Sequence, residues 1–316
     1  MAKGKLEERI DQLRQLRVVG AVAGVEEILR KALSDRSNLI VAEAARTSGE
    51  LGVAGCIPHL LTSFDRFFDD PVKTDPKCWG KSAIVKALVR LDYSESAPFV
   101  RGLRHVQMEP VYGGHEDSAP QLRANCALAL VQCADLRRYE ILAYLVDAMT
   151  DAADPVRVEA VRALHQLGGD ESVLLLRLKA RLGDRRHIII GHVFDALLNM
   201  ERERAVPFVG EYLNSRDEEL RDESALALGS SRLPDALGLL IQTWNEVQID
   251  SYSGVLLRAI SSSRLPEAID FLLNVLRTGS ARQSVAAAEA LKLHEGSENL
   301  QTLIEETKKS RAQSQE

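Results

Sequence analysis

One short segment gathers side chains that could take part in chemistry. Residues 108–120 read MEPVYGGHEDSAP, and within them lie Glu109, Tyr112, His115, Glu116 and Asp117. Imidazole nitrogen and carboxylate oxygens are donors that a divalent metal ion accepts. Adjacent His, Glu and Asp residues rarely converge on one ion without ligands from elsewhere in the chain, so we expect no metal and no cofactor here. Gly113 and Gly114 permit positive φ and close backbone approach.

A second irregular segment, residues 69–78, ends just before Trp79. Both segments connect the first and second helix of an expected helix pair, so they should lie on the same edge of neighbouring repeats. Insertions in repeat proteins map to one face, often the binding face. We therefore expect a partner-binding surface on this edge, formed by Trp79, Tyr112, His115, Glu116 and Asp117. The alternative is that both loops are tolerated decoration, because a longer loop costs little extra closure entropy.

The other candidates for chemistry give no site. Cys126 and Cys133 lie seven residues apart on one expected helix, which predicts two small buried side chains on one face. His187 and His192 are five residues apart and should point to different sides of a helix, unlike a helical zinc pair. Trp244 is in step with neighbouring leucines and is expected in the core. We expect no catalytic residues and no enzyme activity.

The elements that position these residues are helical repeats. Residues 151–168 read DAADPVRVEAVRALHQLG, a turn followed by an alanine-rich helix, and looser copies recur along the chain. Ala160 and Ala225 are about 65 residues apart, or two periods of roughly 32, as in stacked helical repeats. The pattern predicts a capping helix near 6–16, a last amphipathic helix near 297–309, and eight helix pairs at about 24–51, 56–91, 95–134, 137–168, 170–200, 202–230, 233–263 and 265–294.

Three residue types recur at fixed places in the pairs. Proline opens many first helices, where its missing N–H has no partner to lose. Alanine dominates the second helices, where small side chains let neighbouring repeats approach closely. Arginine follows near the start of the second helix, and aspartate precedes it by six residues in two repeats. We expect these charged residues to connect repeats, an aspartate accepting from the next repeat's arginine: Asp117, Arg123, Asp151, Arg157 and Arg221.

The Asp-Pro-Val-Arg-Val-Glu-Ala-Val-Arg-Ala-Leu segment, with proline in the first helix and Asp/Arg in the second, resembles HEAT repeats, particularly the short bacterial HEAT-like units. The resemblance implies a right-handed α-solenoid (an armadillo-type superhelix) whose second helices line a concave surface that holds a partner protein. Deoxyhypusine hydroxylase is similar in its helix pairs but needs His-Glu pairs where this chain has Val158-Glu159 and Asp222-Glu223. HEAT-type DNA glycosylases need a basic, aromatic groove, which the composition argues against.

Size and charge favour one soluble repeat domain. The formal net charge is −6, with acidic and basic residues alternating along most helices, so we expect no nucleic-acid partner. No apolar run approaches the roughly 20 residues that span a bilayer, and the first residues lack a signal-peptide stretch. We expect a cytoplasmic protein with a repeat domain over 1–309 and a polar, disordered tail over 310–316. The sequence leaves the oligomeric state open.

These patterns predict a non-catalytic scaffold or adaptor that binds a partner protein or peptide. Besides the two loops, a polar strip on the second helices should contribute to binding: Lys81, Asn125, Gln132, Arg162, Gln166, Asp195 and Asn199. The alternative is an accessory lyase or a binder of a small molecule or chromophore, similar to the phycobilin lyases, that uses the 109–117 loop.

Overall fold

The computed structural model describes residues 2–20, 24–246 and 250–294, together with 301, 303–305 and 307. Most of the last helix expected at 297–309, and the whole tail 310–316, lie outside the described residues. Contacts between Cα atoms divide the chain into two compact units, Met1–Leu167 and Gly168–Glu316. Each unit is described by itself, and the single repeat domain expected over 1–309 stays a prediction.

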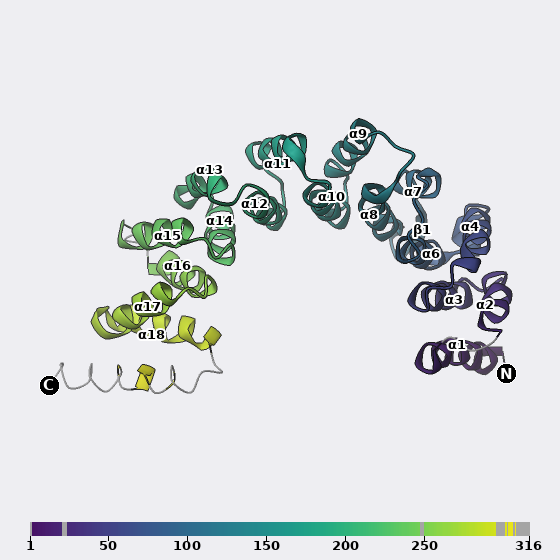
Figure 1. Cartoon of the computed structure of the whole chain (residues 1–316), viewed down its shortest axis with the longest axis horizontal. Helices are drawn as coiled ribbons and strands as arrows, with labels where there is room; N and C mark the ends of the chain where they lie inside the picture. The colour runs from purple at the N-terminus through teal and green to yellow at the C-terminus, as the bar shows by residue number, and fades with distance from the viewer. Residues whose placement is uncertain are drawn as a thin grey trace. The chain divides into compact units, whose positions relative to one another are not determined.

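Unit 1 begins with α1 (Ala2–Val19) and continues in helix pairs whose members fall into two rows (Figure 1). The A row holds the first helix of each pair: α2 (Val25–Leu33), α4 (Ile57–Arg66), α7 (Ala97–Leu103) and α9 (Arg138–Met149). The B row holds α1 and the second helices: α3 (Asn38–Glu50), α6 (Trp79–Arg90), α8 (Pro120–Ala129) and α10 (Asp154–Leu167). Short pieces join them: η1 (Ala54–Cys56), α5 (Pro71–Thr74), η2 (Pro76–Cys78) and η3 (Leu130–Gln132).

Unit 2 repeats the plan (Figure 1). Its A row comprises α11 (Gly169–Leu182), α13 (Val206–Gly210), α15 (Pro234–Glu246) and α17 (Pro266–Thr278). Its B row comprises α12 (His187–Glu201), α14 (Glu218–Ser230), α16 (Asp250–Ser262) and α18 (Ala281–Leu291). The 3-10 turns are η4 (Arg202–Ala205), η5 (Glu211–Asn214) and η6 (Lys292–His294). The predicted all-α solenoid of helix pairs is confirmed. A search of the described residues finds no helix with the length and apolar character needed to span a membrane.

Small residues set how closely the B helices approach one another. A Cβ atom added to Gly49 of α3 would lie 3.1 Å from the Ala87 Cα of α6. A Cβ atom added to Gly229 of α14 would lie 2.1 Å from the Ala259 carbonyl oxygen of α16, far inside van der Waals contact. The backbones of these neighbouring repeats therefore touch, as the alanine-rich pattern predicts.

The structure corrects three details of the sequence interpretation. The 108–120 segment is no plain loop, because it forms an antiparallel hairpin of β1 (Met108–Val111) and β2 (Gly114–Asp117). Cys126 and Cys133 are both buried, but α8 ends at Ala129 and the turn η3 separates them, so they share no helix face. Trp244 is only half-buried, with its ring edge-on to Phe271 at 5.3 Å between centroids.

Candidate functional site

The hairpin in unit 1 is the largest departure from the repeat. Met108 pairs with Asp117 and Val111 with Gly114, so Tyr112 and Gly113 form a two-residue turn. Gly113 has φ of 90°, a value that side chains with a Cβ rarely adopt. Tyr112 sits at the other turn position with its side chain fully exposed. Gly113-Gly114 is the sequence signal that could have indicated this turn, although Gly114 itself pairs in β2.

Glu109 fastens the first strand to the preceding loop. Its Oε1 accepts hydrogen bonds from the Lys77 backbone N–H at 2.6 Å, the Ser118 hydroxyl at 2.5 Å and the Gln107 amide at 2.7 Å. Burial alone would raise the pKa of Glu109, but these hydrogen bonds outweigh it and hold the pKa below its usual range. Glu109 is therefore committed to structure, and the 69–78 and 108–120 segments form one joined surface.

Gln107 extends this connection into the interior. Besides Glu109, its side-chain N–H group donates to the Asp75 carbonyl oxygen at 2.9 Å. Its Oε1 accepts from the Cys78 thiol at 3.2 Å. Gln107, Ser118 and Asp75 were not singled out from the sequence, because nothing local signals that distant loops share these bonds.

Asp117 ends the hairpin and joins it to α8, the second helix of the same pair. It accepts from the Arg123 Nη1 at 2.7 Å and from the Ala119 and Gln107 backbone N–H groups. Burial by itself would raise the pKa of Asp117, but these donors lower it below the ordinary value. Most of the hydrogen-bonding capacity of this carboxylate is thus used inside the protein, although 24% of the side chain remains exposed.

Arg123 is the centre of this connection. Its Nε and Nη2 bind the two carboxylate oxygens of Asp151 at 2.8 and 3.0 Å, and Nη1 also donates to the His105 carbonyl oxygen at 3.1 Å. Asp151 belongs to the following repeat, so an arginine reaches forward to the next repeat's aspartate. That direction is opposite to the one expected from the sequence.

The other two arginines of the pattern are also held by the protein. Arg157 is buried, and its contacts include Asp154 at 2.7 Å and the Asp151 carbonyl oxygen at 2.8 Å. Arg221 has Ser215, not aspartate, six residues before it. Its guanidinium lies 4.0 Å from the centroid of the Tyr252 ring, and its Nε lies 3.8 Å from the Asp222 carboxylate.

The exposed part of the hairpin surface consists of apolar and polar side chains around its turn. Met108, Val111 and Tyr112 are exposed large hydrophobics, and His115 and Glu116 of β2 are exposed as well. Trp79, the first residue of α6, is half exposed, and the Lys77 ammonium lies 5.6 Å from its ring centroid. Because the Lys77 backbone binds Glu109, Trp79 and the hairpin emerge from the same joined surface. We call Trp79, Met108, Val111, Tyr112, His115 and Glu116 the hairpin surface.

The expected polar strip on the B helices is only partly present. Lys81 is wholly buried, and its Nζ lies 3.2 Å from the Asp75 carboxylate and donates to the Phe67 carbonyl oxygen at 3.0 Å. Asp75, from the loop before α6, folds under the helix and turns Lys81 inward. Arg162 of α10 is exposed and paired with Glu159 at 2.7 Å.

Asn125 of the same strip lines a narrow slit between α6 and α8. The slit has a volume of about 210 Å³, with Val85, Val89 and Leu128 among its walls. The amide nitrogen of Asn125 is buried and has no hydrogen-bond partner among the described residues. A buried amide without a partner favours a ligand that brings a hydrogen-bond acceptor.

Asp195 lies in unit 2, half-buried on α12. Burial raises its pKa, and the nearby His192 offsets this only in part. Glu223 of α14 approaches it, and a Cβ added to Gly191 would meet the Glu223 Oε2 at 2.1 Å, so the Glu223 carboxylate packs directly on the α12 backbone at Gly191. The pKa of Glu223 is raised by burial and by the charge of Asp195.

No group of three or more potential metal ligands is found within the described part of the chain. In the hairpin, Glu109 lies opposite Glu116 and Pro110 opposite His115, while Glu109 and Asp117 are engaged in internal hydrogen bonds. Within the described structure, the side chains of Glu109, His115, Glu116 and Asp117 therefore do not converge on one metal position.

Comparisons with known proteins identify no family for this chain. No family model matches the chain, and no curated protein matches it. Among solved structures, the chain is similar to human deoxyhypusine hydroxylase in complex with glycerol, at 19% identity and a TM-score of 0.30, covering 92% of this chain and 91% of that one. Two engineered proteins are similar at 14% and 16% identity, with TM-scores of 0.37 and 0.30. The match to the first covers 96% of this chain and 90% of the engineered chain. The match to the second covers 89% of this chain and 98% of the engineered chain.

Proposed function

We propose that this chain is a HEAT-like, non-catalytic scaffold of the cytoplasm that binds a partner protein or peptide through the hairpin surface. The observation that carries the proposal is an exposed aromatic turn on a rigid base. Tyr112 is fully exposed, yet the hairpin beneath it is held by Glu109, Asp117 and Arg123. A large aromatic side chain presented on an ordered element loses little entropy on binding, which is typical of an interface anchor.

The composition of the hairpin surface supports the same function. Exposed Met108, Val111 and Tyr112 provide apolar area, and His115 and Glu116 provide hydrogen-bonding groups beside it. An apolar centre with polar neighbours is the usual anatomy of a protein interface. The Asn125 slit on the B helices offers a second, smaller contact for an acceptor group of the partner.

The test compares partner capture by variants of the immobilised full chain. Tyr112→Asn removes the aromatic side chain and leaves an Asn-Gly sequence, which favours a tight turn. Tyr139→Ala is the matched control, because Tyr139 is also exposed in unit 1 but lies on α9. We expect a protein retained by the wild type and by Tyr139→Ala to be lost with Tyr112→Asn, and purified partner to show at least tenfold weaker binding.

Retention of every partner by Tyr112→Asn would refute the hairpin surface as the binding site. Thermal unfolding of the same variants separates the structural alternative, since a large drop in Tm for Tyr112→Asn would mean that the turn serves stability. A visible absorption band in the purified wild-type protein would instead favour the chromophore-binding alternative.

A further inference from the structure

The helix α1 occupies a B-row position without an A-row helix beside it. It packs against α3 as the other B helices pack on each other: the Thr47 hydroxyl donates to the Leu13 carbonyl oxygen at 3.2 Å, and Arg17 pairs with Glu43 and Glu50. Every other B helix of unit 1 follows an A helix of its own pair, whereas no helix among the described residues fills that place for α1. The side of α1 that an A helix would cover is left open.

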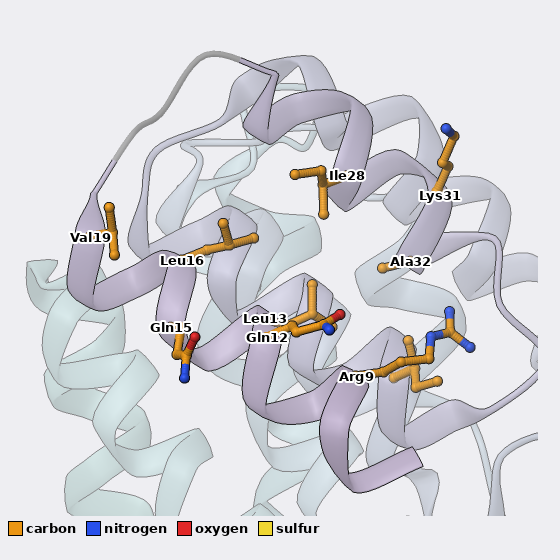
Figure 2. A pocket seen from close by; sticks show the side chains of 10 residues that line it. Arg9, Gln12, Leu13, Gln15, Leu16, Val19, Ile28, Lys31 and Ala32 are labelled. Atoms are coloured by element: carbon orange, nitrogen blue, oxygen red, sulfur yellow. The ribbon is translucent and has the colours of Figure 1, made fainter. Parts of the chain in front are cut away.

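An apolar groove lies at this open position, between α1 and α2 (Figure 2). Its volume is about 490 Å³, within the roughly 300–1,000 Å³ range of ligand sites. Leu16 and Val19 lie toward the last residues of α1, Ile28 of α2 lies near the middle of the groove, and Val19 and Ile28 are exposed. The lining runs along α1 from Arg9 to Val19, about 15 Å or three helical turns at 1.5 Å per residue.

The groove has one apolar and one charged end. Arg9 of α1 and Lys31 of α2 both lie at the end away from Val19, on opposite sides of the groove, as Figure 2 shows. Arg9 pairs there with Asp35 at 2.7 Å, and the exposed Lys31 ammonium lies 3.8 Å from Glu27. None of the ten lining residues is acidic. An A helix in this place would run parallel to α2, so its carboxyl end would meet Arg9 and Lys31. Cations are favourable next to the carboxyl end of a helix, where the helix dipole is negative.

We propose that this groove is a second docking site, which binds an amphipathic helix of a partner protein in the position of an A helix. The helix carries an apolar stripe at i, i+3 or i+4, and i+7 toward Leu16, Val19 and Ile28, and carboxylates in its last turn toward Arg9 and Lys31. Helix-in-groove recognition uses this spacing of anchors. The site lies on α1 and α2 and does not depend on the hairpin surface, so either proposal can fail alone.

The test measures binding of two labelled helical peptides, 15 residues long, to the full chain by fluorescence anisotropy. Both peptides carry leucines at positions 4, 8 and 11, and they end in two glutamates or in two lysines. We expect the glutamate peptide to bind at least tenfold more tightly than the lysine peptide. Arg9→Glu combined with Lys31→Glu should reverse that order, and Tyr112→Asn should leave it unchanged.

Two neighbouring valines supply matched variants. Val19 lines the groove, whereas Val18 is even more exposed and is not among the lining residues. Val19→Glu should weaken binding of the glutamate peptide at least tenfold, whereas Val18→Glu should leave its affinity within twofold of the wild type. The two variants should unfold at the same temperature. Equal effects of the two variants, equal affinity for the two peptides, or no binding at 1 mM peptide would overturn the proposal. A dimer seen by sedimentation in the wild type and lost in Val19→Glu would identify a second copy as the occupant and would overturn it as well.

Discussion

Replacing Arg123 with methionine should show how much the contacts of Arg123 with the hairpin and with the following repeat stabilise unit 1. Methionine keeps much of the apolar stem but removes the guanidinium that binds Asp117, Asp151 and the His105 carbonyl oxygen. Removing one partner of a buried ion pair costs about 3–5 kcal/mol, because the other charge stays behind. Here the two carboxylates keep backbone donors and are partly accessible to water, with 24% and 17% of their side chains exposed. We therefore expect a loss of about 3 kcal/mol in the free energy of unfolding of unit 1 at pH 7.

The assay must report on unit 1 separately, since repeat proteins need not unfold in one step. The two tryptophans allow this, because Trp79 lies in unit 1 and Trp244 in unit 2. In a Trp244→Phe background, the fluorescence of Trp79 during urea denaturation follows unit 1. Arg162→Met is the matched control, because Arg162 is exposed and paired only on the surface, where ion pairs contribute about 0–1 kcal/mol.

The pH dependence gives the same experiment a second readout. The pKa of Asp117 is lower in the folded protein than its ordinary value of about 3.9. Its stabilising contribution is therefore complete above that ordinary value and is lost as the pH falls through the folded pKa. The difference between wild type and Arg123→Met should be constant near neutral pH and shrink below about pH 4. A loss under about 1 kcal/mol at pH 7, or a difference that does not shrink in acid, would refute this account of the Arg123 contacts.

Three further predictions concern unit 2. Glu223→Gln should stabilise the protein near neutral pH, because burial and Asp195 raise the pKa of Glu223. A raised folded pKa makes the wild type lose stability as the pH rises above the ordinary glutamate value. The free energies of unfolding of the two proteins, measured with urea, should therefore converge below about pH 4.3. Arg221→Met should cost about 1 kcal/mol, less than Arg123→Met, since Arg221 stacks on Tyr252 and has only a long contact of 3.8 Å with the Asp222 carboxylate; a cost as large as that of Arg123→Met in Trp244 fluorescence would contradict this. Gly229→Ala should lower the stability of unit 2 by about 1–3 kcal/mol through overpacking against α16, and an unchanged denaturation midpoint would show that the helices can separate freely.

The repeat architecture was predictable because its causes are local. Helix starts follow from proline and aspartate, as at Pro58, Pro98 and Asp154, and close helix packing follows from glycine and alanine. All eight pair boundaries estimated from these signals agree with helix pairs in the structure. The sequence predicts an insertion at 108–120 and not a hairpin, although the two glycines after Tyr112 are a turn signal in themselves.

The interior of the candidate site could not be predicted, because it depends on contacts between distant loops. Lys81 occupies a helix position that helical spacing assigns to a solvated strip, yet Asp75 lies beneath it and compensates its charge. Glu109 looks like a surface ligand in the sequence, and only the fold shows that its Oε1 already accepts from Lys77 and Ser118. For Asp117 the sequence leaves a surface role and a contact with an arginine both open, and the fold shows the contact with Arg123. Whether a charged residue lies at the surface or in an internal hydrogen-bond network depends on its partners in the fold. Sequence periodicity does not reveal those partners.

Some residues of the hairpin anchor it to the repeat, and others are exposed at its turn. Every hydrogen bond that fixes the hairpin to the repeat comes from residues at its base, such as Gln107, Glu109 and Asp117, within the described contacts. Val111 and Tyr112 at the turn have exposed side chains. New turn sequences can therefore be exchanged without rebuilding the support beneath them. If the proposed function holds, substitution of a few turn residues would give the same hairpin different partners, and a library at 111, 112, 115 and 116 that keeps Gly113 would explore new specificities at little cost in stability.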